Sequence, residues 1–213
     1  FQESFAPETR PVTRIDLVDV ADPAAPRVLR RLEAEGHLVG ARMIDGHVFV
    51  VLSSHLDLPA AVWELAWRSD LGLPELPTGA TEEERQAAAE EARTILRPLL
   101  ADVFAEIAVE ELLPAMTDTS APAPEARRPL LGCDSLLTPA DTASYAALSV
   151  LHLDLGADDP LSAPLDATGL LAEGFTVYAT ARSLYVAHSS WWWWWGWGDP
   201  DMTSVVHRFS LDP

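Results

Sequence analysis

The sequence contains no lysine. All 14 positively charged side chains are arginines, against 33 acidic residues, and the net charge of the 213-residue chain is −19. A field of this sign repels the phosphate backbone of nucleic acids and anionic lipids, so the composition argues against nucleic acid as a partner. We interpret the acidic residues as a solvated surface, in preference to a specific site for a cation or a basic partner.

Cysteine is almost absent as well. The single residue, Cys133, excludes a disulfide bond within the chain and a metal site made of several cysteines. No stretch approaches eighteen consecutive apolar residues, so no membrane-spanning segment is predicted. The motifs GxSxG, GxGxxG and GxxxxGK are missing, and the six histidines show no HxH or HExxH spacing. We therefore predict no catalytic residue, no metal site and no cofactor.

One strand-like pattern occurs twice and begins a third time. Residues 13–54 and 149–190 align through the sequence Ala-Glu-Gly, at 34–36 in the first copy and at 172–174 in the second. In each copy this sequence is followed by two short apolar segments and then by a pair of serines. Residues 205–213 match the start of the pattern, after which the chain stops in mid-repeat. Repetition of a four-stranded unit builds a β-propeller, because each blade buries its faces against its neighbours.

Each copy contains a predicted hairpin. In the first copy, residues 37–43 and 48–52 flank Asp45-Gly46, a pair that favours a tight primed turn. In the second copy, residues 175–180 and 184–187 form a shorter hairpin. We expect the second strands of the two hairpins to be equivalent.

The segment between the copies has a different character. Thr81 and Glu84 fit a helix capping box, and the pattern stays helical to about residue 113, with Pro98 as the expected break or kink. Its apolar side chains form a one-sided stripe, which must cover another surface; they are Ile95, Leu99, Leu100, Val103, Phe104, Ile107 and Leu112. We predict propeller strands in residues 1–58, a helical insertion and proline-rich loop in residues 59–132, and propeller strands with a tryptophan-rich loop in residues 133–213.

Several of these segments resemble a known family. Residues 15–54, the sequences LLPAM and LLGCDSLLTP before ALSVLHLDL, and LYVAHSS followed by TSVVHRFSLDP resemble the secreted bacterial and archaeal proteins with a β-propeller domain distantly related to WD repeats. The resemblance implies an exported protein, secreted or in the cell envelope, with further blades on both sides of this chain, and it brings no catalytic residues. In that family the position of Cys133 often holds a cysteine. A bond from Cys133 to a cysteine elsewhere in the protein therefore stays open beside a buried free thiol.

Six tryptophans crowd into seven positions late in the chain: Trp191, Trp192, Trp193, Trp194, Trp195 and Trp197. Alternate side chains of a strand point to opposite faces, so these rings cannot all enter one core. They form a surface for a protein partner or a second copy, an intramolecular cluster with Trp63 and Trp67, or a platform for carbohydrate. We predict the partner-binding surface and keep the other two as alternatives.

Two aspartate-rich turns offer oxygen atoms at alternate positions, as calcium-binding loops do. They contain Asp199, Asp201 and Thr203 in one case and Asp154, Asp158 and Asp159 in the other. Aspartate is also common in ordinary turns, which is the interpretation that we prefer. Calcium therefore remains an alternative to the absence of any cofactor.

The sequence as a whole predicts a mainly β fold, a partial β-propeller of about two four-stranded antiparallel blades with an α-helical insertion. We expect a non-enzymatic exported module for protein binding or extracellular assembly, with the tryptophan-rich loop and the helical insertion as contact surfaces. One alternative is a propeller enzyme of the hydrolase, lyase or dehydrogenase type, with its site at the central channel. The other is a carbohydrate-binding protein with its site at the channel or at the tryptophan loop.

Overall fold

The computed structural model describes residues 10–120, 127–139, 145–157, 165–189 and 204–211. The chain divides into two compact units. The first comprises residues 1–56 and 113–213, and the second comprises residues 57–112. We call the first the β unit and the second the helical unit, and describe each by itself.

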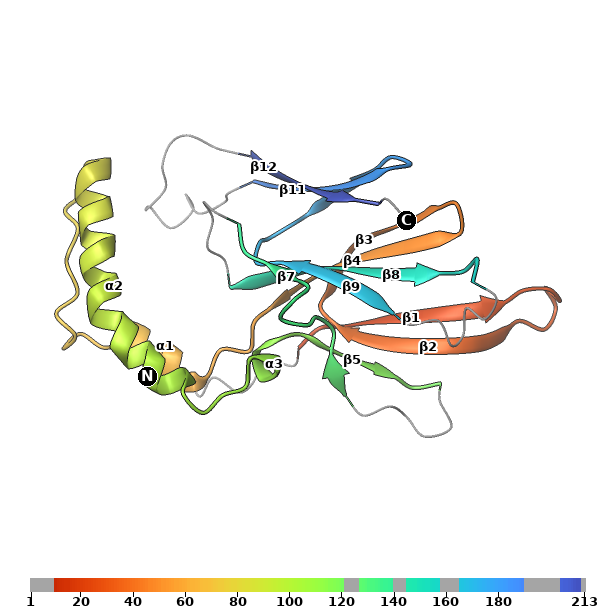
Figure 1. Cartoon of the computed structure of the whole chain (residues 1–213), viewed down its shortest axis with the longest axis horizontal. Helices are drawn as coiled ribbons and strands as arrows, with labels where there is room; N and C mark the ends of the chain where they lie inside the picture. The colour runs from red at the N-terminus through yellow and green to blue at the C-terminus, as the bar shows by residue number, and fades with distance from the viewer. Residues whose placement is uncertain (1–9, 121–126, 140–144, 158–164, 190–203, 212–213) are drawn as a thin grey trace. The chain divides into compact units, whose positions relative to one another are not determined.

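The β unit contains three sheets (Figure 1). The first consists of β1 (Val12–Asp19), β2 (Arg27–Glu35), β5 (Ala115–Asp118) and β6 (Arg128–Pro129), in that order. The second has the order β3 (His37–Ile44), β4 (His47–His55), β8 (Ala146–Asp154), β9 (Asp166–Leu170) and β7 (Leu136–Leu137). The third consists of β10 (Thr176–Ala179), β11 (Ser183–Ser189) and β12 (Ser204–Ser210). All of these pairs are antiparallel except β7 with β9.

The mainly β fold with a helical insertion is confirmed, but the described strands form three sheets where the sequence predicted about two blades. The reason is that each copy of the sequence repeat begins in one sheet and ends in the next. Residues 13–54 give two strands to the first sheet and two to the second, and residues 149–190 give two to the second and two to the third. The predicted equivalence of the hairpins is confirmed, since β4 and β11 are each the second strand of a hairpin that pairs onward with the next strand.

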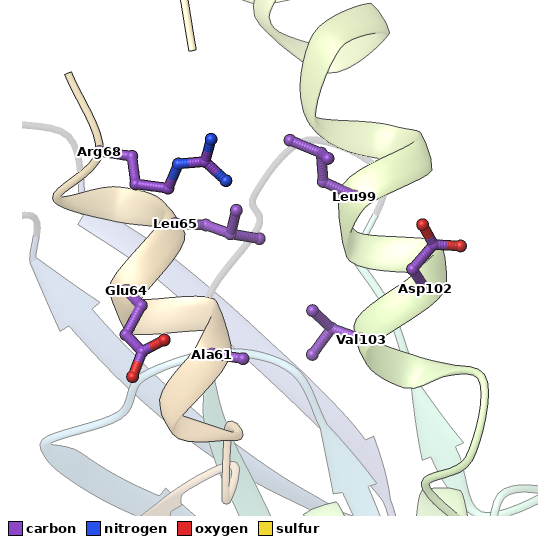
Figure 2. A pocket seen from close by; sticks show the side chains of 7 residues that line it. All are labelled: Ala61, Glu64, Leu65, Arg68, Leu99, Asp102 and Val103. Carbon is purple, nitrogen blue, oxygen red and sulfur yellow. The ribbon is translucent and has the colours of Figure 1, made fainter. Parts of the chain in front are cut away.

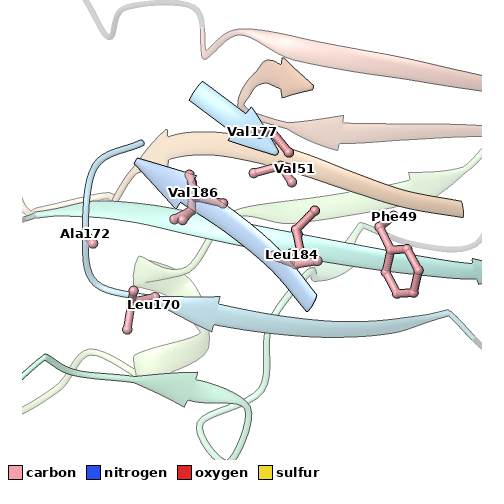
Figure 3. Packing of buried hydrophobic residues seen from close by; sticks show 9 residues of the cluster. Phe49, Val51, Leu170, Ala172, Val177, Leu184 and Val186 are labelled. Atoms are coloured by element: carbon pink, nitrogen blue, oxygen red, sulfur yellow. The ribbon is translucent and has the colours of Figure 1, made fainter. Parts of the chain in front are cut away.

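The second sheet is the centre of the β unit because both of its faces are buried. Along β4, Phe49 and Val51 pack with Val177, Leu184 and Val186 of the third sheet (Figure 3). The intervening Val50 and Leu52 belong to a second cluster, which also contains Leu32, Ala34 and Met116 of the first sheet. This alternation is the period of a β-strand, and stacking successive sheets face to face is how propeller blades bury their apolar surface.

The tight turn predicted between β3 and β4 is present. Asp45 has φ 49° and Gly46 has φ 85°. Positive φ at both central residues is the requirement of the primed turn that joins two-residue hairpins, and Asp-Gly meets it with little strain. The turn therefore sets the register in which Ile44 pairs with His47.

The helical unit contains α1 (Ala60–Ala66), α2 (Glu82–Phe104) and α3 (Val109–Leu112). The predicted capping box is present: the N–H of Glu84 donates to the Thr81 hydroxyl, and the N–H of Thr81 donates to the Glu84 carboxylate. The sequence predicted a break or a kink at Pro98, and the helix continues through this residue without a break. No residue of α2 is buried. The predicted apolar stripe is half-buried along its length.

The proline-rich stretch after the helices, which was predicted to be a loop, contains two short strands. β5 pairs with β2, bringing Leu32 opposite Asp118, and β6 pairs with β5. Asp118 accepts a hydrogen bond from Arg30 at 2.9 Å. Strands this short leave almost no periodic pattern in a sequence, so the loop prediction was wrong for a stretch that covers the edge of β2.

Candidate functional site

The predicted tryptophan surface, Trp191 to Trp197, lies outside the described residues. The strands on either side of it are described. Ser189 ends β11, Ser204 begins β12, and these two residues pair directly across the strands. The tryptophans therefore belong to the segment that connects two neighbouring antiparallel strands of the third sheet.

The helical unit is inserted at the equivalent connection of the second sheet. There His55 ends β4 and pairs with Ala146, which begins β8. The hairpin turns β3–β4 and β10–β11 lie at one end of their sheets, and β4 and β11 both run from those turns towards the opposite end (Figure 1). β4 and β11 consequently finish at the same end of two successive sheets, and the chain continues from β4 into the helical unit and from β11 into the segment that contains the tryptophans.

The helical unit exposes aromatic surface. Trp63 is 47% exposed on α1, and Trp67, the C-cap residue that follows this helix, is 81% exposed. Indole rings expose a large apolar area, and such residues are enriched where proteins bind one another. The alternative of an intramolecular cluster of Trp63 and Trp67 with the later tryptophans involves residues outside those described and stays an alternative.

A shallow groove of about 240 Å³ lies between α1 and α2. It is lined by Ala61, Glu64, Leu65, Arg68, Leu99, Asp102 and Val103. Figure 2 shows Leu65, Leu99 and Val103 pointing into it from the two helices. Arg68 at the rim donates two hydrogen bonds to Asp70, at 2.9 and 2.8 Å, and this pairing lowers the pKa of the aspartate. The groove combines apolar side chains with the charged side chains of Glu64, Arg68 and Asp102.

The three stacked sheets and the repeat that spans them agree with comparison to known proteins. A family model described as a beta propeller domain matches residues 2–213. The chain belongs to the β-propeller domain family. Neither the curated proteins nor the solved structures contain a match to this β-propeller domain.

Two histidines of the β-propeller domain meet although 105 residues separate them in the sequence. His47 Nδ1 lies 3.0 Å from His152 Nε2. The Nδ1 atom also lies 3.6 Å from Asp154 Oδ1. Sequence reasoning missed this pair because metal-ligand motifs are recognised by short spacings, whereas here the register of β4 and β8 brings the residues together.

The aspartate of the described turn is engaged by the backbone. Asp154 Oδ1 accepts the N–H of Gly156 at 2.8 Å, as in an ordinary aspartate turn. The other candidate calcium ligands, Asp158, Asp159, Asp199, Asp201 and Thr203, lie outside the described residues. Calcium at either turn stays an alternative to the predicted absence of a cofactor.

Cys133 is exposed, so the expectation of a buried thiol is wrong. The physical reason is its position: Gly132 and Ser135 close a turn around it, with the N–H of Ser135 donating to the Gly132 carbonyl at 3.2 Å. A side chain in a surface turn has no core to enter.

Glu35 of the first sheet is a charged side chain with several partners. It accepts hydrogen bonds from Arg10 at 2.7 Å, Arg127 at 2.9 Å and the N–H of Ala115 at 3.0 Å. Burial raises the pKa of Glu35, but the hydrogen bonds from the two arginines and from Ala115 together outweigh it and leave the pKa below its ordinary value. Glu35 thus ties three separate segments together, which is a structural role.

In the described residues, no helix is long and apolar enough to cross a membrane.

Proposed function

We propose that this β-propeller domain is a non-enzymatic, exported module that binds a protein partner or assembles with other copies. Its contact surfaces are the tryptophan-rich segment, Trp191 to Trp197, and the helical unit. The observation that carries the proposal is the common origin of the two insertions, which leave equivalent connections at the same end of successive sheets.

Equivalent connections of successive blades supply one face of a propeller, and binding surfaces are commonly built from such loops on a rigid scaffold. The β unit that carries these connections has a packed core, since apolar clusters cover both faces of its second sheet. The scaffold therefore meets the requirement of a rigid support for a contact surface.

The chemistry of the insertions favours association over catalysis. Trp67 is 81% exposed, and α2 has no buried residue. Burial of one tryptophan at an interface contributes a few kcal/mol, at roughly 25 cal/mol per Å² of apolar surface. Six tryptophans within seven positions would give a strong association site.

The proposal is tested by replacing Trp193, Trp194 and Trp195 with serine in the full chain. We expect the molar mass measured by light scattering after size exclusion to decrease toward that of one chain, with only a small decrease in melting temperature. Tyr178→Ser is the matched control, because this aromatic side chain on β10 is 65% exposed. The control should leave the molar mass unchanged.

Two other outcomes would contradict the proposal. A collapse of the melting temperature with unchanged molar mass would show that the rings are internal packing. Loss of binding to soluble oligosaccharides in the triple variant, with no effect on association, would favour the carbohydrate-binding alternative.

A further inference from the structure

The two histidines that meet on the second sheet are held as a pair by its strand register. His47 lies opposite Asp154, and Phe49 lies opposite His152, so the two imidazoles are diagonal neighbours on one face. Asp166 of β9 lies opposite His152 and shares this face. These two histidines and two aspartates therefore occupy one face of the sheet near one of its ends.

Neighbouring side chains and the backbone contact the two histidine rings and the adjacent aspartate. The ring of Phe49 stacks on that of His152, with centroids 4.9 Å apart and an interplanar angle of 11°. The centroid of His47 lies 5.1 Å from that of His152. The carboxylate of Asp154 is held in turn by the N–H of Gly156. The His47 side chain is 36% exposed and that of Asp154 is 39% exposed, so a hydrated ion has access to this group.

The distance between the two ring nitrogens matches that between two ligands of one metal ion. Imidazole nitrogens bind Zn²⁺ at about 2.0–2.1 Å. Two such nitrogens lie about 2.9 Å apart when they subtend 90° at the ion and about 3.3 Å apart at the tetrahedral angle. The observed separation between His47 Nδ1 and His152 Nε2 is 3.0 Å.

We propose that His47 and His152 form a two-imidazole binding site for a divalent first-row transition metal ion. Imidazole ligands suit Zn²⁺, Cu²⁺ and Ni²⁺. In the described part of the chain, no three side chains of histidine, cysteine, aspartate or glutamate are grouped so as to hold a metal ion. The site accordingly supplies two protein ligands, and water completes the coordination.

Binding of the ion replaces the hydrogen bond between the two rings. The ion lies off the line that joins the two nitrogens, because the midpoint of that line is only about 1.5 Å from each of them. A hydrogen bond between neutral imidazoles needs an N–H on one of the two facing nitrogens. When the ion binds, both facing nitrogens present lone pairs, and the donor ring carries its proton on its other nitrogen. The nearby carboxylate of Asp154 and the net charge of −19 favour a cation at this place.

The site is tested by titrating NiCl₂ into the full chain in a calorimeter. The variants are His47→Gln and His152→Gln, and the matched control is His37→Gln, an exposed histidine on β3. We expect one ion per chain in the wild type and in the control, and at least a tenfold loss of affinity in each of the two variants. Unchanged affinity in both variants would overturn the proposal.

A second measurement guards against misfolding of His152→Gln, whose ring packs on Phe49. Substoichiometric CuCl₂ added to the wild type should broaden the ring-proton resonances of His47 and His152 before those of the other histidines. Broadening centred on other histidines would contradict the site. Neither measurement involves a protein partner, so failure here is distinguishable from failure of the proposed partner binding.

Discussion

The glycine that ends the shared Ala-Glu-Gly sequence is required by the hairpin that follows it. At Gly174, an added Cβ would lie 2.4 Å from Val186 Cγ1 and 2.9 Å from Leu148 Cδ1. At Gly36, φ is 127° and an added Cβ would lie 3.1 Å from the carbonyl oxygen of Ser53. The repeat therefore keeps glycine where the chain passes directly against the second hairpin strand.

Gly174→Ala is expected to lower the free energy of unfolding by about 1–3 kcal/mol, because the new methyl group overpacks a buried site. The measurement is chemical denaturation of the full chain. Gly156→Ala is the matched control, since its position is exposed and the nearest atom is the carboxylate oxygen of Asp154 at 3.3 Å. Equal effects of the two changes would show that the loss of stability comes from backbone entropy and not from packing.

At the scale of the elements, the helical insertion has well-defined boundaries along the chain. The N–H of Asp57 donates to the carbonyl of Leu112 at 2.8 Å, so the chain enters and leaves the helical unit at one point. Leu113, Ala115 and Met116 are buried in the β unit. A boundary drawn from the loop-like sequence of residues 114–132 would cut into the first sheet.

Replacement of residues 57–112 by a short Gly/Ser linker is expected to leave the β unit folded, because its two core clusters contain no residue of the helical unit. Far-ultraviolet circular dichroism should keep its β signal and lose its helical part. As a control, the linker can replace residues 57–118, which also removes β5. This longer deletion should destabilise the protein, and loss of the β signal in both deletions would show that the helices are part of the core.

At the scale of the whole molecule, the carboxylates of the first sheet make the stability of the fold depend on pH. Burial raises the pKa of Asp118, but hydrogen bonds from Ser120 and Arg30 outweigh it, so that this pKa, like that of Glu35, lies below its ordinary value. A group whose pKa is lower in the folded state contributes stability above its unfolded pKa, about 4 for these groups. That contribution is lost as the pH falls through the folded pKa.

We therefore expect the melting temperature to decrease as the pH is lowered from 5 toward 2.5, and Glu35→Gln to reduce the slope of that decrease. Acid also relieves charge repulsion in a chain of net charge −19, so the difference between variant and wild type isolates Glu35. Glu33→Gln, an exposed position on the same strand, is the control. A slope that Glu35→Gln leaves unchanged would contradict the role of this carboxylate.

The sequence by itself determined the features that depend on neighbouring residues. Strand alternation, the primed turn at Asp45-Gly46 and the capping box of Thr81 and Glu84 are local, because they depend on side chains a few positions apart. The repeat extended this local information to the fold class, since successive copies imply stacked blades. The tryptophan surface is also a sequence prediction, and it remains to be tested.

Only the tertiary structure decided which strands share a sheet. It placed each repeat across two sheets, paired β5 with β2 and brought His47 to His152. These contacts join residues that are distant in the chain, and their formation depends on which apolar faces are buried together. A one-dimensional pattern records that a face must be buried but not which partner buries it.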